Sequence, residues 1–281
     1  MGWAVAIERE YAELSDALVS ELMEFVVVGH VADMPTADSE EMHHVTYRVP
    51  ADSAGTEHDF TVTCRVASVF NDVGLKIWEA GWFLAEYVLA HRHLFEGRTV
   101  LELGAGVGFT GVVLAKCVAA KRLVMSDYAP KVMLNLMYNT EINALEVPYK
   151  CPVHVETIDW DTWEPEETSK EFARPDILLA GDCVYDIGAF PSLVRVLQVF
   201  LGIENKESGT TSPARFAIFA ATIRNQATFQ VFLDTLEQYR ITYEDVTTTS
   251  LKNMSETPLF PYENCGQIRL CKLYRTLSNE N

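Results

Sequence analysis

The sequence of 281 residues lacks long apolar runs, and this excludes several classes of protein. None of its apolar stretches approaches the length of about 18 residues that a membrane-spanning helix requires. Its first residues do not combine a basic segment with an apolar core, which is the pattern of a secretory signal. We therefore expect a cytoplasmic protein that has no membrane partner.

Paired-cysteine motifs are also missing. The six cysteines are scattered, and no two of them have the C-x-x-C spacing that is typical of zinc and redox sites. The seven histidines show no H-E-x-x-H pattern or other ligand spacing. Cys117 and Cys183 fall in apolar stretches, where a cysteine behaves as a small buried hydrophobic residue. We expect no metal site.

Basic residues are few, because 22 Lys and Arg stand against 40 Asp and Glu, for a net charge of −18. Such a surface repels nucleic acid, so we expect no nucleic-acid partner. It suits a basic protein partner, although solubility alone also explains it. Residues 1–75 hold 14 acidic and 3 basic residues. This asymmetry predicts an acidic N-terminal extension over residues 1–72, followed by a second domain over residues 73–281.

The hydrophobic pattern predicts different structures in these two parts. In the extension, it predicts a helix over 8–29 and a strand pair at 44–49 and 59–66. From residue 73 on, strands alternate with helices, which is typical of a parallel, doubly wound α/β sheet. The strands are expected at 100–103, 122–127, 153–159, 176–181, 216–221, 241–247 and 267–274. The helices are expected at 78–90, 108–120, 131–143, 190–201 and 227–239.

A glycine-rich run follows the first strand of this second part. It reads Glu-x-Gly-x-Gly-x-Gly from Glu102 to Gly108. Glycine permits a positive φ and lets the backbone approach a ligand, and the next helix offers unpaired N–H groups at its start. The dinucleotide pattern G-x-G-x-x-G fails, because Phe109 stands in the third glycine position. A dehydrogenase and a plain tight turn stay open as alternatives.

Polar residues also end the next three strands of the predicted sheet. They are Asp127, then Asp159 with Trp160, then Asp182 and Tyr185. Ligands of open α/β sheets lie beyond the carboxyl ends of the strands. An acid about 20 residues past the glycines is placed to accept hydrogen bonds from ribose hydroxyls. Three of them also have a plainer interpretation, because Asp127 and Asp182 could each cap a helix and Trp160 could fill the core.

Together these residues give the chain a family resemblance. Asp182-Cys183-Val184-Tyr185 matches the D-x-x-Y signature of the seven-strand lysine methyltransferases. The Glu-x-Gly-x-Gly-x-Gly run, Asp159-Trp160 and an upstream tryptophan, Trp78, match as well. The resemblance covers roughly residues 73–275. Within the group, stretches 221–225 and 259–263 resemble the methyltransferases of eukaryotic elongation factor 2.

The resemblance implies a fold, a cofactor and a substrate class. The fold would be the Rossmann-like seven-strand class I methyltransferase fold, here with an N-terminal helix and β-hairpin extension. The cofactor would be S-adenosyl-L-methionine, and the partner a protein substrate, elongation factor 2. Asp182 and Tyr185 would be catalytic and face the incoming lysine. Carried over by position, the cofactor-binding residues would be Trp78, Glu102, Gly104, Ala105, Gly106, Asp127, Asp159, Trp160 and Ala180.

Such a reaction requires a neutral lysine amine, although the pKa of a free lysine is about 10.4. Desolvation by aromatic walls lowers that pKa. We expect Asp182 to orient the amine, and Tyr185 to offer it a π face, with Tyr262 or Phe260 as further aromatic candidates. Another lysine, a small molecule or a non-catalytic binding role stays open. Nothing in the sequence indicates an obligate interface, so we expect a monomer.

Overall fold

The computed structural model describes residues 41–68, 73–163, 175–202, 215–262 and 267–275. By contacts the chain divides into two compact units, Met1–Glu41 and Met42–Asn281. All described residues except Glu41 belong to the second unit. The expected helix over 8–29 lies outside the described residues. The strand pair that the prediction assigned to the extension clusters with the second unit. The boundary after residue 72 stays a prediction.

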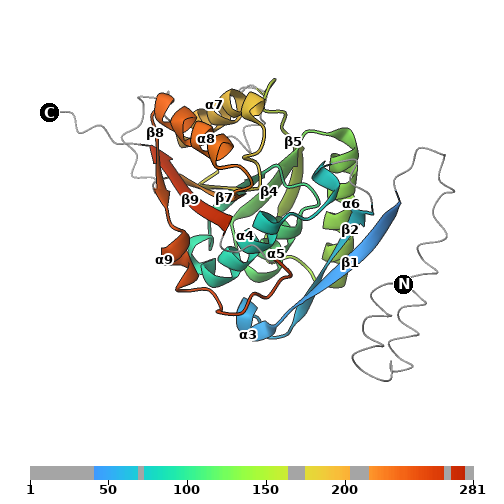
Figure 1. Ribbon diagram of the computed structural model, residues 1–281. Coiled ribbons are helices and arrows are strands. Elements are labelled where there is room, and N and C mark those ends of the chain that lie inside the picture. The colour runs from blue at the N-terminus through green and yellow to red at the C-terminus, as the bar shows by residue number, and fades with distance from the viewer. Residues whose placement is uncertain (1–40, 69–72, 164–174, 203–214, 263–266, 276–281) are drawn as a thin grey trace. The chain divides into compact units, whose positions relative to one another are not determined.

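A seven-stranded sheet in the order β5-β4-β3-β6-β7-β9-β8 forms the centre of this unit (Figure 1). Its strands are β3 (Thr99–Leu103), β4 (Arg122–Asp127), β5 (Val153–Thr157), β6 (Ile177–Gly181), β7 (Phe216–Thr222), β8 (Ile241–Asp245) and β9 (Ile268–Arg275). Strand β9 runs antiparallel between β7 and β8, and the other described pairs are parallel. This confirms the expected Rossmann-like seven-strand fold.

The helices lie where the periodicity predicts them, to within a few residues. The main ones are α4 (Glu79–Ala90), α5 (Phe109–Cys117), α6 (Pro130–Glu146), α7 (Phe190–Leu201) and α8 (Gln226–Gln238). Shorter helices, which the sequence pattern does not predict, are α3 (Ala51–Ala54), α9 (Thr247–Leu251), η1 (Val73–Leu75), η2 (Arg92–Leu94) and η3 (Ile187–Ala189). Local chemistry sets several helix starts: Pro130 opens α6, and the Asn225 side chain caps α8 by accepting from two backbone N–H groups.

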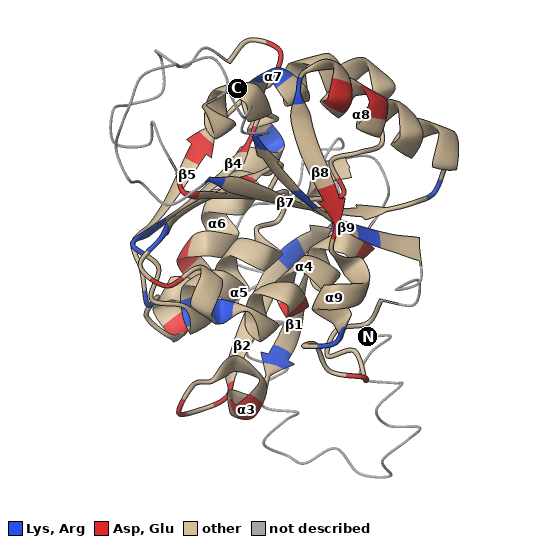
Figure 2. Cartoon of the chain, turned by 90° about the vertical axis from the view of Figure 1, so that its left-hand side faces the viewer, with Lys and Arg blue, Asp and Glu red and all other residues tan. Residues whose placement is uncertain are grey.

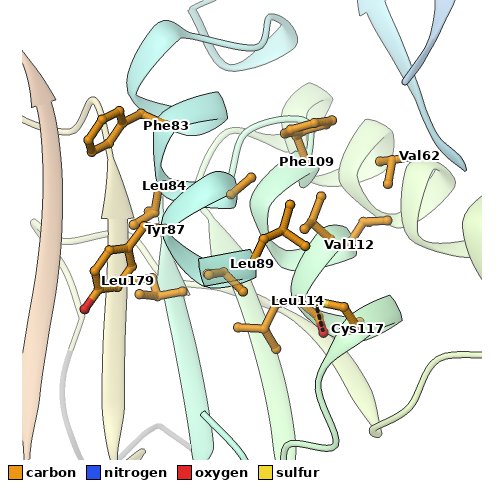
Figure 3. Close-up of a cluster of buried hydrophobic side chains, with 14 of the residues drawn as sticks. Val62, Phe83, Leu84, Tyr87, Leu89, Phe109, Val112, Leu114, Cys117 and Leu179 are labelled. Carbon is orange, nitrogen blue, oxygen red and sulfur yellow. Dashed lines mark hydrogen bonds between the residues drawn. The ribbon is translucent and has the colours of Figure 1, made fainter. Parts of the chain in front are cut away.

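Two hydrophobic cores hold the sheet between its helices. Strand β6 is apolar throughout, so Ile177 and Leu179 enter one core while Leu178 and Ala180 enter the other. The first core joins α4, α5 and α6 to the sheet, and the second joins α7 and α8 to it. In the first core, side chains of α4 and α5 meet Leu179 of the sheet (Figure 3). Because the middle residues of these strands are packed in the cores, only the strand ends can contact a ligand.

A two-stranded antiparallel hairpin packs beside this core. It consists of β1 (Met42–Val49) and β2 (Phe60–Ala67), close to the expected ranges. Asparagines of α6 bind the free backbone edge of β2: Asn143 accepts from the Thr63 N–H at 3.0 Å, and Asn139 accepts from the Arg65 N–H at 2.8 Å. Asn139 also donates to the Val107 carbonyl at 2.9 Å, which links the hairpin to the glycine loop.

Charges of both signs are spread over the described elements (Figure 2). The described residues hold 22 acidic and 18 basic side chains, so most of the net charge of −18 lies in the segments outside them. Within the described part of the chain, no helix has the length and apolarity to cross a membrane. In the same part, no group of His, Cys, Asp and Glu side chains could hold a metal ion.

Candidate active site

The loop between β3 and α5 forms the floor of a pocket at the carboxyl edge of the sheet. Gly104, Gly106 and Gly108 have φ values of 60°, 56° and 83°. A Cβ atom at Gly104 would lie 2.8 Å from the Cys183 Sγ, and one at Gly106 would lie 3.1 Å from the Gly74 carbonyl oxygen. Both positive φ and close packing therefore require glycine here. The loop is a backbone cradle that side chains would fill.

Asp127 ends β4 and turns its carboxylate towards this loop. Its Oδ2 accepts from the Gly106 N–H at 3.1 Å, and its Oδ1 accepts from the Tyr128 N–H at 2.8 Å. The residue that caps α6 is Ala129, which makes no side-chain capping bond. Asp127 is thus not a helix cap, and its carboxylate lies in the pocket wall.

Glu102 lies beneath the loop and is 4% exposed. Burial raises the pKa of its carboxyl group to about 8, and the nearby Asp127 charge adds to the rise. Its Oε2 atom is buried and has no hydrogen-bond partner. This oxygen lies against α5, where a Cβ at Gly111 would be 2.6 Å from it, while Glu102 as a residue also lines the pocket.

Two tryptophans border the same pocket. Trp78 precedes α4, and its Nε1 donates to the Val73 carbonyl at 2.8 Å. Trp160 follows β5 and lies against the glycine loop, where its ring atom Cζ2 would be 3.6 Å from a Cβ at Gly104. Their rings supply apolar walls on which a planar or aliphatic group can rest.

Asp182 follows β6 in an unusual conformation, with a φ of 54°. Its side chain is 5% exposed and points back into the protein. It accepts hydrogen bonds from Thr222, at the end of β7, and from the Ala80 N–H in the first turn of α4. The Arg224 guanidinium lies 3.3 Å from its Oδ2. Asp182 therefore joins three elements at one corner of the pocket, and it does not cap the helix that follows.

Tyr185 differs from Asp182, because its side chain is 57% exposed at the mouth of the pocket. Partial burial, followed by the neighbouring Cys183, raises the pKa of its hydroxyl. The hydroxyl therefore stays protonated at neutral pH. The other two aromatic candidates do not lie in the pocket: Phe260 packs in the first core, and the Tyr262 hydroxyl donates to Glu86 at 2.8 Å. The expectation that they face the amine is wrong.

Nine of the eleven predicted site residues line one pocket with a volume of about 480 Å³. They are Trp78, Glu102, Gly104, Ala105, Gly106, Asp127, Trp160, Asp182 and Tyr185. The two exceptions neighbour it. Ala180 is fully buried inside β6, and the next residue, Gly181, lines the pocket instead. Asp159 accepts from the Asp161 N–H at 3.0 Å, and the residue that lines the pocket here is Trp160.

The pocket also contains residues that the sequence did not single out for binding. They include Lys76, Phe109, Thr110, Tyr128 and Arg224. Lys76 Nζ and the Arg224 guanidinium carbon lie 5.0 Å and 4.9 Å from the centre of the Trp78 ring. Arg224 belongs to the stretch 221–225, whose resemblance to elongation factor 2 methyltransferases was the one signal that could have pointed to it.

These features fit S-adenosylmethionine. The glycine cradle admits a backbone approach, the carboxylates of Asp127 and Glu102 line the pocket as hydrogen-bond acceptors, and Trp160 offers a face for a planar base. The volume of about 480 Å³ is within the usual range for pockets that hold a molecule of this size.

Comparison with known proteins agrees with this geometry. The sequence model of the lysine methyltransferase family matches residues 65–238. The chain belongs to the lysine methyltransferase family. Its methyl donor is S-adenosylmethionine, and its activity class is protein-lysine methylation, as the resemblance implied.

The relatives include the protein-lysine N-methyltransferase EEF2KMT of mouse, which is 28% identical over 93% of this chain and 72% of its own length. An uncharacterised protein of Dictyostelium discoideum is 30% identical over 76% of this chain, which spans 62% of that protein. Among solved structures, SMU.776, a proposed methyltransferase complexed with SAH, has a TM-score of 0.50 and 13% identity, and covers 92% of this chain and 65% of its own. That likeness shows the fold.

Proposed function

We propose that this enzyme transfers methyl groups from S-adenosylmethionine to a lysine of elongation factor 2. The observation that carries the proposal is the pocket itself, in which a glycine cradle and two carboxylates lie beside an exposed tyrosine at the mouth. The mouse relative that covers most of the chain is named protein-lysine N-methyltransferase EEF2KMT, which supports the choice of substrate. The stretches 221–225 and 259–263 support it as well.

The residues take complementary roles in this proposal. When bound, S-adenosylmethionine supplies a sulfonium methyl group as the electrophile. Gly104, Ala105 and Gly106 hold it with their backbone, while Glu102 and Asp127 accept from its hydroxyl groups. Trp160 borders its base and Trp78 its other end. Asp159 and Ala180 do not line the pocket, and they contribute by positioning their neighbours Trp160 and Gly181, which do.

The lysine approaches past Tyr185. Its amine must be neutral to attack, and the Lys76 and Arg224 charges that line the pocket favour the neutral form because they repel an ammonium ion. The tyrosine ring offers a π face to the amine and to its methylated forms. Alignment of the amine with the methyl group supplies most of the rate. We also infer that the enzyme works as a monomer in the cytoplasm and binds no nucleic acid and no membrane, consistent with its net charge of −18.

Methyl labelling of a cell lysate prepared without this protein tests the proposal. We expect wild-type enzyme and labelled S-adenosylmethionine to label one band with the size of elongation factor 2. The Asp127→Ala variant removes an acceptor from the cofactor pocket and should lose the label. A band of another size would contradict the substrate. Absence of label despite measurable S-adenosylmethionine binding would contradict the activity and favour a binding module.

A further inference from the structure

The Asp182 carboxylate is fully engaged by the protein itself. Oδ1 accepts from the Thr222 N–H at 2.9 Å and from the Arg224 Nη1 at 3.4 Å. Oδ2 accepts from the Thr222 hydroxyl at 3.0 Å, and from the Ala80 N–H and the Arg224 Nη2 at 3.3 Å each. A carboxylate has about four lone-pair sites, so these five donors leave none for an incoming amine.

Arg224 carries the influence of this carboxylate into the pocket. Its side chain is 46% exposed and lines the pocket, while the Asp182 side chain behind it is 5% exposed. The two Arg224 nitrogens face the two carboxylate oxygens, which is the bidentate arrangement that fixes a guanidinium in one orientation. Held in this way, the guanidinium lies over the ring of Trp78, 4.9 Å from its centre.

Trp78 is consequently fixed from two directions. Its Nε1 donates to the Val73 carbonyl at 2.8 Å, and its ring is covered by Arg224. The Lys76 ammonium lies 5.0 Å from the same ring centre, so the ring already has two cations beside it and repels a further one. Among the pocket aromatics, Tyr185 and Tyr128 offer exposed rings to the lysine amine, and Tyr185 is the one beside Asp182 in the sequence.

We propose that Asp182 is a positioning residue, which holds Arg224 over Trp78 and thereby shapes the lysine entrance, and that it does not contact the amine. This replaces the expected amine-orienting role of Asp182 and rests on the lysine methylation proposed above. Arg224 becomes a further specificity-determining residue of the pocket, because its position sets the wall past which the lysine must pass.

A double-mutant cycle tests this proposal. Steady-state methylation of elongation factor 2 is measured at saturating S-adenosylmethionine for wild type, Asp182→Asn, Arg224→Met and the double variant. We expect each single variant to lower kcat/KM for the protein substrate about tenfold. The kcat/KM of the double variant should be no lower than that of the less active single variant. Arg224→Lys keeps the charge but not the fork, so it should recover only part of the loss.

Arg269→Met is the matched control. Arg269 is 43% exposed and paired with Asp245 at 3.8 Å, and it does not line the pocket. Its kcat/KM should equal that of wild type. Melting curves with and without S-adenosylmethionine show whether each variant is folded and binds its donor. If Asp182→Asn does not fold, kcat/KM of Arg224→Met and Arg224→Lys still tests whether the half-exposed Arg224 shapes the lysine entrance.

Three results would overturn the proposal. One is wild-type kcat/KM in Arg224→Met. Another is a loss of about a thousandfold in Asp182→Asn alone, which a group in contact with the amine would give. The third is losses that multiply in the double variant, because independent roles multiply. Absence of methylation by the wild-type enzyme would instead contradict the proposed function, and the two failures are therefore distinguishable.

Discussion

At the scale of single residues, Glu102 couples the pocket to pH. Burial raises its pKa to about 8, so the carboxyl group is largely protonated at neutral pH when the pocket holds no ligand. A ligand whose hydroxyl groups donate to this carboxyl prefers its ionised form. Binding below pH 8 must therefore release a proton, and affinity rises with pH up to that value.

The dissociation constant of S-adenosylmethionine should accordingly fall as pH rises from about 6 to 8, by up to about tenfold per unit, and level off above. Titration calorimetry in two buffers of different ionisation enthalpy measures both the constant and the proton release. In Glu102→Gln the constant should be weaker and flat across the range. A wild-type constant that does not change with pH would contradict this role of Glu102.

A substitution at Gly104 can separate the effect of backbone strain on stability from the effect of a side chain on ligand binding. Gly104→Ala places a Cβ at a φ of 60° and 2.8 Å from the Cys183 Sγ, so both stability and S-adenosylmethionine binding should fall. Gly97 is a matched control, because its φ is 66° but a Cβ there meets no atom within 4 Å. Gly97→Ala should lose about 1–2 kcal/mol of stability from the backbone alone. Equal donor affinity in the two variants, measured by calorimetry, would refute the cradle.

Sequence reasoning located the pocket because strand ends are fixed by short-range patterns. Glu102 and Asp127 end strands that the hydrophobic pattern delimits, and the topology brings such ends to one edge. The partners of Asp182 could not be predicted, because Thr222 and Arg224 lie 40 and 42 residues away. Tyr262 was misplaced for the same reason, since the acid that it binds is 176 residues distant.

At the scale of elements, the asparagines of α6 replace a strand partner for β2. They recur every fourth residue, at 135, 139 and 143, and thus share one helix face. Each is buried, and their amides bind backbone or side-chain groups of β2. The sequence shows this polar stripe, but an isolated helix gives no sign that a strand edge covers it. The hydrophobic pattern also does not indicate that β9 runs antiparallel to both of its neighbours.

Asn139→Ala tests this contact between elements. It leaves the Arg65 N–H and the Val107 carbonyl without their partners, so the free energy of unfolding should fall by about 2–4 kcal/mol. Denaturant titration measures the loss. The neighbouring variant Thr140→Ala removes only a bond to the Leu136 carbonyl of its own helix and should cost less than about 0.5 kcal/mol. Similar losses in both variants would show that the asparagine contacts with β2 contribute nothing specific.

At the scale of the whole molecule, the acidic charge is concentrated towards the start of the sequence. The described residues are nearly balanced, with 22 acidic and 18 basic side chains, whereas residues 1–75 alone hold 14 acidic residues against 3 basic ones. We propose that the acidic residues of segment 1–72 attract a basic surface of the protein substrate.

The most direct test of the account is the intact mass of purified elongation factor 2 after incubation with this enzyme and S-adenosylmethionine. We predict a mass increase of one or more methyl groups, located on a single lysine by peptide fragmentation and absent with Asp127→Ala. An unchanged mass under conditions where calorimetry shows the enzyme to be saturated with its donor would contradict methylation of this substrate.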